Sequence, residues 1–99
     1  MQFAKVIGTV VCTRKDEKLE GRKLLLVQPV NIKYEPSGNP LVAVDAVQAG
    51  TGELVLLCSG SSARQTKLTE SRPCDAVIMA IVDTVERDGT VTFDKSQGS

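Results

Sequence analysis

The stretch AGTGELVLLCSGSSARQT, residues 49–66, decides the fold of this chain. Its glycines, Gly50 and Gly52, indicate a tight turn, because glycine adopts turn conformations at no steric cost. The apolar segment 53–59 that follows has the length and composition of a β-strand. Serines that can cap a helix then precede alanine and arginine, so a short helix is expected over 62–67.

The start of this helix, Gly60 to Arg64, suits either a catalytic or binding site or a contact between subunits. A nucleophilic Ser61 or Ser62 would need a general base and an oxyanion hole. The chain contains no histidine, and this segment does not match the Gly-x-Ser-x-Gly elbow of hydrolases. Helix capping explains both serines without catalysis, so the sequence does not indicate an enzyme.

The glycines of the turn are a weak signal for nucleotide binding. Gly50-Thr51-Gly52 lacks the third glycine of the dinucleotide fingerprint, and a strand rather than a helix follows it. A phosphate-binding loop would need a Gly-Lys-Ser or Gly-Lys-Thr sequence, which the chain does not contain. We therefore interpret both glycines as turn residues that let backbones pass closely, and we expect no cofactor.

The rest of the chain alternates apolar segments with turns. The expected strands cover residues 6–13, 23–30, 41–47, 53–59, 75–85 and 90–93. Segment 31–40 contains two prolines and is expected to be a surface loop, and Asp88-Gly89 favours a tight hairpin. Short strands joined by turns, with one short helix, predict a single all-β domain over 1–99 that folds as a small barrel.

Three of the expected strands are apolar on both faces, in segments 24–27, 54–58 and 77–82. One face of each strand can fill the barrel, and the other face needs a cover. We interpret the second face as buried between subunits. The alternative is that the helix and the loops of the same chain cover it.

The composition excludes several classes of protein. Twelve basic and twelve acidic residues give a net charge of zero, and aromatic residues make up 3% of the chain. A nucleic-acid-binding domain normally has a basic excess and aromatic side chains for base stacking. No apolar run approaches the roughly 20 residues of a membrane-spanning helix, and residues 1–5 lack the layout of a signal peptide. We expect a cytosolic protein without nucleic acid or membrane partners.

A metal site is also disfavoured by the residue types. Histidine is absent, and Cys12, Cys58 and Cys74 are scattered without a Cys-x-x-Cys spacing. Each cysteine lies in or beside an apolar stretch. We expect all three to be small core residues in a reducing compartment.

Two carboxylates, Asp45 and Asp83, interrupt apolar strands. A buried carboxylate is costly unless it is hydrogen-bonded or paired. The two could form an acid/base pair, but hydrogen bonds to backbone or arginine at a strand end or subunit contact are the better interpretation. Arg64 and Arg72 are the arginine partners that we consider first.

Four segments occur in an order that resembles a known family. They are VIGTVVCT, LEGRKLLLVQPV, LVAVDAVQAGTGELVLLCSGSSAR and PCDAVIMAIVD, and they span Val6 to Asp83. Together they resemble the bacterial microcompartment vertex family, also called the EutN/CcmL family. The segment GTGELVLLCSGSSARQ and the tail VTFDKSQ look most like the ethanolamine-utilisation type. Cys74 stands where an aliphatic residue is more usual in that family.

The resemblance implies an OB-like β-barrel that assembles as a homopentamer. Five copies would form a ring that closes the vertices of a metabolosome shell in the bacterial cytoplasm, beside hexameric facet proteins. The rival interpretation is a small OB-like module that binds a ligand or nucleic acid. Candidates for the subunit interface or the pore are Asp45, Gly50, Gly52, Gly60, Ser61, Ser62, Arg64 and Asp83.

Arg64→Glu distinguishes a subunit contact from a pore at the expected helix. Five helix N-termini near one axis would favour anions, and Arg64 would strengthen that field. Loss of the ring, measured by light scattering, is the result expected for a contact role. An intact ring with weaker anion occupancy in a soaked crystal is the result expected for a pore role. An intact ring with unchanged anion binding would contradict both roles.

Overall fold

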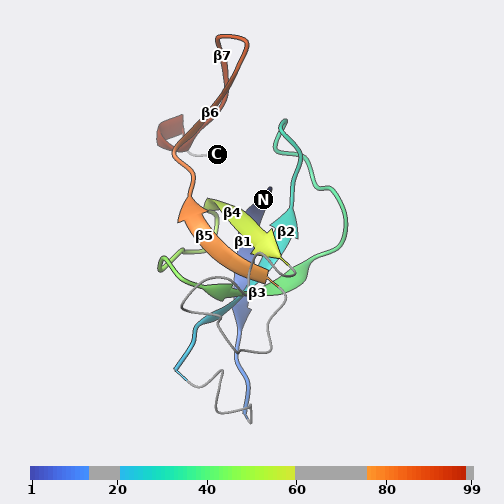
Figure 1. The fold of residues 1–99 in the computed structure, drawn as a ribbon, viewed down its shortest axis with the longest axis vertical. Helices are drawn as coiled ribbons and strands as arrows, with labels where there is room; N and C mark the ends of the chain where they lie inside the picture. The colour runs from blue at the N-terminus through green and yellow to red at the C-terminus, as the bar shows by residue number, and fades with distance from the viewer. Residues whose placement is uncertain (14–20, 60–75, 98–99) are drawn as a thin grey trace.

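The computed structural model describes residues 1–13, 21–59 and 76–97. In these residues the chain forms β-strands and one short 3-10 helix (Figure 1). The strands are β1 (Gln2–Val10), β2 (Leu24–Pro29), β3 (Leu41–Asp45), β4 (Leu54–Ser59), β5 (Ala76–Ile81), β6 (Thr84–Arg87) and β7 (Thr90–Asp94). The 3-10 helix spans Lys95–Gln97 and follows β7 directly.

Five of the strands close into a barrel in the order β1-β2-β3-β5-β4. β1 completes the closure because it pairs with both β2 and β4. Neighbouring strands are antiparallel except β3 and β5, which run parallel with Val44 opposite Val77. This arrangement confirms the expected all-β barrel of OB-like form.

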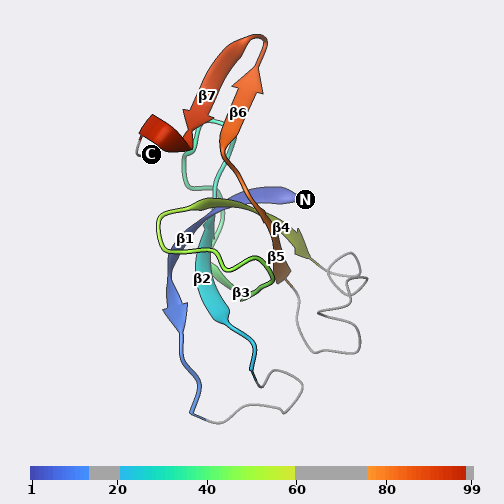
Figure 2. The same ribbon diagram turned by 90° about the vertical axis from the view of Figure 1, so that its left-hand side faces the viewer.

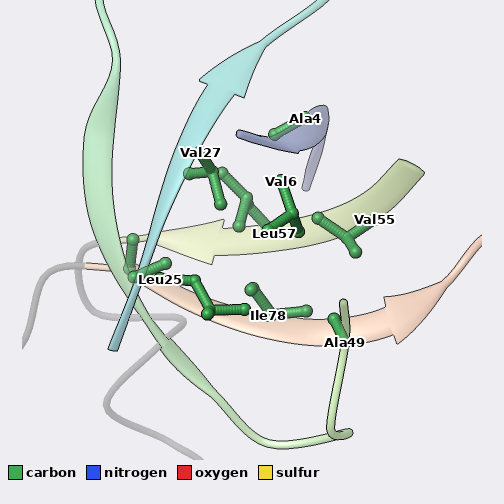
Figure 3. Packing of buried hydrophobic residues seen from close by; sticks show 10 residues of the cluster. Ala4, Val6, Leu25, Val27, Ala49, Val55, Leu57 and Ile78 are labelled. Carbon is green, nitrogen blue, oxygen red and sulfur yellow. The ribbon is translucent and has the colours of Figure 1, made fainter. Parts of the chain in front are cut away.

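The barrel interior is filled by side chains from alternate positions of each strand, as the two-residue period of a β-strand requires. Val6, Val27, Leu57 and Ile78 are at most 1% exposed and point into the barrel (Figure 3). The loop between β3 and β4 folds back and adds Ala49 to this cluster. Burial of an aliphatic side chain as large as valine or isoleucine contributes about 1.5–3 kcal/mol, so this cluster stabilises the barrel.

The expected strands are found, with changes at their ends. The first begins at Gln2 rather than at residue 6 and ends at Val10, because its first residues pair with β4. The prediction of one strand over 75–85 is wrong, since this segment divides into β5 and β6. The exposed Asp83 lies in the short connection between these two strands. β6 then leaves the barrel and pairs with β7.

Two expected turns are confirmed. Asp88 and Gly89 have positive φ angles of 53° and 81°, the conformation of a tight hairpin, and they join β6 to β7. In the exposed loop after β2, Asn31 Oδ1 accepts hydrogen bonds from the backbone N–H groups of Lys33 at 2.8 Å and Glu35 at 3.1 Å. Such side-chain bonds to the backbone stabilise a turn locally.

The cysteines do not all behave as expected. Cys58 is buried, which confirms its prediction, but Cys12 is exposed. The prediction for Cys12 is wrong because β1 ends at Val10, so the chain has already left the barrel. Cys74 and the expected helix over 62–67 lie outside the described residues.

Ile78→Ala is expected to lower the free energy of unfolding by about 2–5 kcal/mol, because it leaves a cavity inside the barrel. Ile32→Ala is the matched control, since Ile32 is 38% exposed in the loop after β2 whereas Ile78 is 0% exposed. Urea unfolding of both variants at one protein concentration measures the difference. Equal losses for the two variants would contradict the assigned core.

Candidate assembly surface

An apolar patch lies on the outside of the barrel, over β1, β2 and β3. Its centre is Leu26, which is half-buried and lies between Gly8 of β1 and Val42 of β3. Ile7, at the irregularity of β1, is 41% exposed, and Val42 is 47% exposed. We call Ile7, Leu26 and Val42 the outer patch. Neighbouring exposed aliphatic side chains of this kind favour burial against a partner.

Part of the outer face over β3, β4 and β5 is instead buried in the single chain. Val44, Cys58 and Val77 are at most 7% exposed, and they form a cluster separate from the barrel interior. Leu24 and Met79 pack against this cluster. The second apolar face is therefore divided: one part is buried in the single chain, and the outer patch remains open.

Asp45 ends β3 with a side chain that is 1% exposed. Its Oδ1 accepts a hydrogen bond from the N–H of Val47 at 3.0 Å, which agrees with the expected backbone bond at a strand end. Among the described residues its Oδ2 has no hydrogen-bond partner, and Lys23 Nζ lies 3.9 Å from it. Arg64 and Arg72 lie outside the described residues. A buried carboxylate oxygen without a donor is costly, so a donor from a second molecule would stabilise this site.

Asp83 is exposed and lies far from Asp45. The parallel strands place Asp45 opposite Ile78, and Asp83 follows five residues later, about 16 Å further along at roughly 3.3 Å per residue. The backbone carbonyl of Asp83 accepts a hydrogen bond from the N–H of Lys95 at 2.8 Å. This separation disfavours an acid/base pair between Asp45 and Asp83.

Gly50 and Gly52 form the turn that leads into β4. Gly52 has a φ of 93°, a backbone conformation that residues other than glycine rarely adopt. The N–H of Gly50 donates a hydrogen bond of 2.6 Å to Glu53 Oε1. These contacts agree with the interpretation of both glycines as turn residues.

An ion pair that the sequence did not indicate ties the 3-10 helix to the barrel. Lys95 Nζ lies 2.8 Å from Glu53 Oε2. Hydrogen bonds from Lys95 and from the N–H of Gly50 lower the pKa of the Glu53 carboxyl below its ordinary value of 4.5. The same bond to Glu53 raises the pKa of Lys95. The partners are 42 residues apart, so no local sequence pattern links them.

In the part of the chain that the structure describes, no three or more His, Cys, Asp and Glu side chains gather where they could hold a metal ion. No helix among the same residues is long and apolar enough to cross a membrane. The sequence-based candidates Gly60, Ser61, Ser62 and Arg64 lie outside the described residues. The outer patch is therefore the candidate surface that the described residues define best.

Comparisons with known proteins give one consistent result. Residues 1–83 match the family model described as ethanolamine utilisation protein EutN/carboxysome. The chain is 45% identical over 95 residues to the bacterial microcompartment shell vertex protein EutN of Salmonella typhimurium, with 96% of each chain covered. The solved structure of a carboxysome subunit, CcmL, has a TM-score of 0.90 at 45% identity and covers 96% of this chain and 99% of its own. The GrpN pentameric microcompartment shell protein from Rhodospirillum rubrum has a TM-score of 0.80 at 49% identity, covering 88% and 99%.

Glu53→Gln is expected to remove part of the pH dependence of stability. Because the pKa of Glu53 is lowered in the folded chain, its stabilising effect is present above about pH 4.5 and is lost as the pH falls through the folded pKa. The melting temperatures of the native chain and the variant should therefore differ most near neutral pH and converge in acid. Thermal unfolding across this range measures the difference, with exposed Glu86→Gln as the control. A difference that is constant with pH would contradict the role of the ion pair.

Proposed function

The chain belongs to the EutN/CcmL family, and we propose from this premise that it is a structural shell protein of a bacterial microcompartment. Its homopentamers close the vertices of the shell, which lies in the bacterial cytoplasm and encloses metabolic enzymes. The observation that carries this proposal is the match to GrpN, a pentameric microcompartment shell protein that is 49% identical and covers 88% of this chain. The function requires no catalysis.

The outer patch supports assembly into a ring. Each subunit of a ring contacts its two neighbours through two different surfaces, because the contacts are head-to-tail. The outer patch lies on paired strands of a closed barrel, so it is already ordered before contact. An ordered aliphatic surface can be buried at little further cost in conformational entropy. We propose the outer patch as one of the two contact surfaces.

Hexameric shell proteins are the proposed partners of the ring. Flat hexagonal units alone do not close a polyhedron, so five-fold units are required at its corners. Nucleic acid is not a proposed partner, because the net charge is zero and aromatic residues make up 3% of the chain. The ethanolamine-utilisation type stays a prediction, since the EutN and CcmL relatives are each 45% identical to this chain.

The residues proposed for subunit contact or the pore stay those that the sequence suggested. They are Asp45, Gly50, Gly52, Gly60, Ser61, Ser62, Arg64 and Asp83. Among them Asp45 has the strongest support, because its buried Oδ2 has no hydrogen-bond partner in the part of the chain that the structure describes. A guanidinium group of a neighbouring subunit would supply a charge-assisted hydrogen bond to such an oxygen.

Val42→Asp is expected to convert the ring into folded monomers. The new carboxylate would be hydrated in a monomer but would lose its water in the subunit contact, which is costly without a partner. Val11→Asp is the matched control, because Val11 is 92% exposed beyond the end of β1. Analytical ultracentrifugation measures the mass, and circular dichroism checks the fold. A Val42→Asp pentamer as stable as the native one would contradict the role of the outer patch, whereas a monomeric native chain would contradict the proposed function.

A further inference from the structure

β6 and β7 form an arm, residues 84–94, that stands away from the barrel (Figures 1 and 2). Within residues 1–13, 21–59 and 76–97, these two strands pair only with each other, and the barrel closes without them. A two-stranded ribbon is only marginally stable in water by itself. The arm therefore depends on contacts that its base makes with the rest of the chain.

An apolar cluster separate from the barrel interior holds the base of the arm. Phe93 of β7 is 5% exposed and belongs to this cluster with Val30 and Leu54. Val85 of β6 lies opposite Phe93 and packs against the same cluster. Tyr34, in the loop 31–40 after β2, does so as well, and its ring centroid lies 5.3 Å from that of Phe93. The two rings are tilted by 39°, and tilted aromatic pairs at such a distance attract each other.

Tyr34 makes this contact from a backbone conformation that bulky residues rarely adopt. Its φ is 66°, in the left-handed region, where a Cβ atom lies too close to the following carbonyl oxygen. The N–H of Tyr34 donates a hydrogen bond of 2.9 Å to the carbonyl of Asn31, which closes the turn around this conformation. Glycine would adopt the same conformation without the steric cost. The turn therefore bears a cost for carrying a large side chain at position 34.

The ring of Tyr34, rather than its hydroxyl, makes the contacts. The hydroxyl oxygen is buried and has no hydrogen-bond partner within the described ranges of the chain. Lys5 Nζ, from β1, lies 5.5 Å from the centre of the ring, within reach of a cation–π interaction. The ring thus contacts both a strand of the barrel and the arm.

We propose that Tyr34 is a positioning residue for the arm: its ring holds Phe93, and with it β6 and β7, against the barrel. This contact offsets the steric cost of the backbone conformation of Tyr34. Because the barrel closes without the arm, loss of the ring releases the arm and leaves the barrel intact. The ion pair of Lys95 with Glu53 still ties the 3-10 helix to the barrel, but neither partner belongs to β6 or β7. The inference concerns contacts within one chain, so it does not rest on the proposed pentamer.

Tyr34→Gly tests this role, and Tyr34→Phe is the matched control. Tyr34→Gly removes the ring and relieves the backbone conformation, whereas Tyr34→Phe keeps the ring and removes only the hydroxyl. Native-state hydrogen exchange, followed by mass spectrometry, measures the protection of amides in the arm and in β2 of the same chain. We expect protection in the arm to fall about tenfold or more in Tyr34→Gly and less than about threefold in Tyr34→Phe, with β2 changed less than about threefold in both.

Native protection of the arm in Tyr34→Gly would contradict the proposal, as would arm amides that are already unprotected in the native chain. An equal fall in the arm and in β2 would also overturn it, because the ring would then support the whole domain rather than the arm. Circular dichroism checks that each variant is folded. If Tyr34→Gly does not fold, Phe93→Ala removes the other ring of the same contact and is judged by the same outcomes.

Discussion

Closure of the barrel by β1 is the interaction on which the rest of the structure depends. β1 pairs with β2 along Ala4 to Val10 and with β4 along Gln2 to Lys5. The double pairing gives each of the five barrel strands a hydrogen-bonded neighbour on both sides. A barrel closed in this way offers no strand edge to a second molecule, so its contacts with other chains must use side chains. This is why the outer patch, rather than a strand edge, is the proposed contact surface of the barrel.

A second constraint is the size of the chain. A domain of 99 residues removes only about 60–65% of its unfolded surface from water, so it cannot bury both faces of every strand. Part of the face over β3, β4 and β5 is buried around Val44, Cys58 and Val77, but Ile7 and Val42 stay open. We propose that assembly completes the burial that a single small chain leaves unfinished.

The positions of the strands were largely predictable, because alternation and β-branched residues are local properties of the sequence. Asp88-Gly89 likewise predicted its hairpin, since only a few residue types tolerate positive φ at both central positions. The ion pair of Glu53 with Lys95 was not predictable, because it joins residues 42 apart. The exposure of Cys12 was missed for a similar reason: the apolar run continues past Val10, but the pairing of β1 ends there.

Of the candidate site, only the need for a contact surface between chains was predictable from the sequence. Strands that are apolar on both faces indicated that a partner is needed, but they contain no information about how many subunits a ring holds. The number five came from the resemblance to a family, which the match to a pentameric shell protein supports. The open position of Val42 beside Leu26 required the register of β2 with β3, which sequence periodicity does not define.

Cryo-electron microscopy of the purified native chain tests this account most directly. We expect rings of five-fold symmetry in which Ile7, Leu26 and Val42 of each subunit are buried by a neighbour. Rings of six-fold symmetry, or five-fold rings that leave these three side chains exposed to solvent, would contradict it.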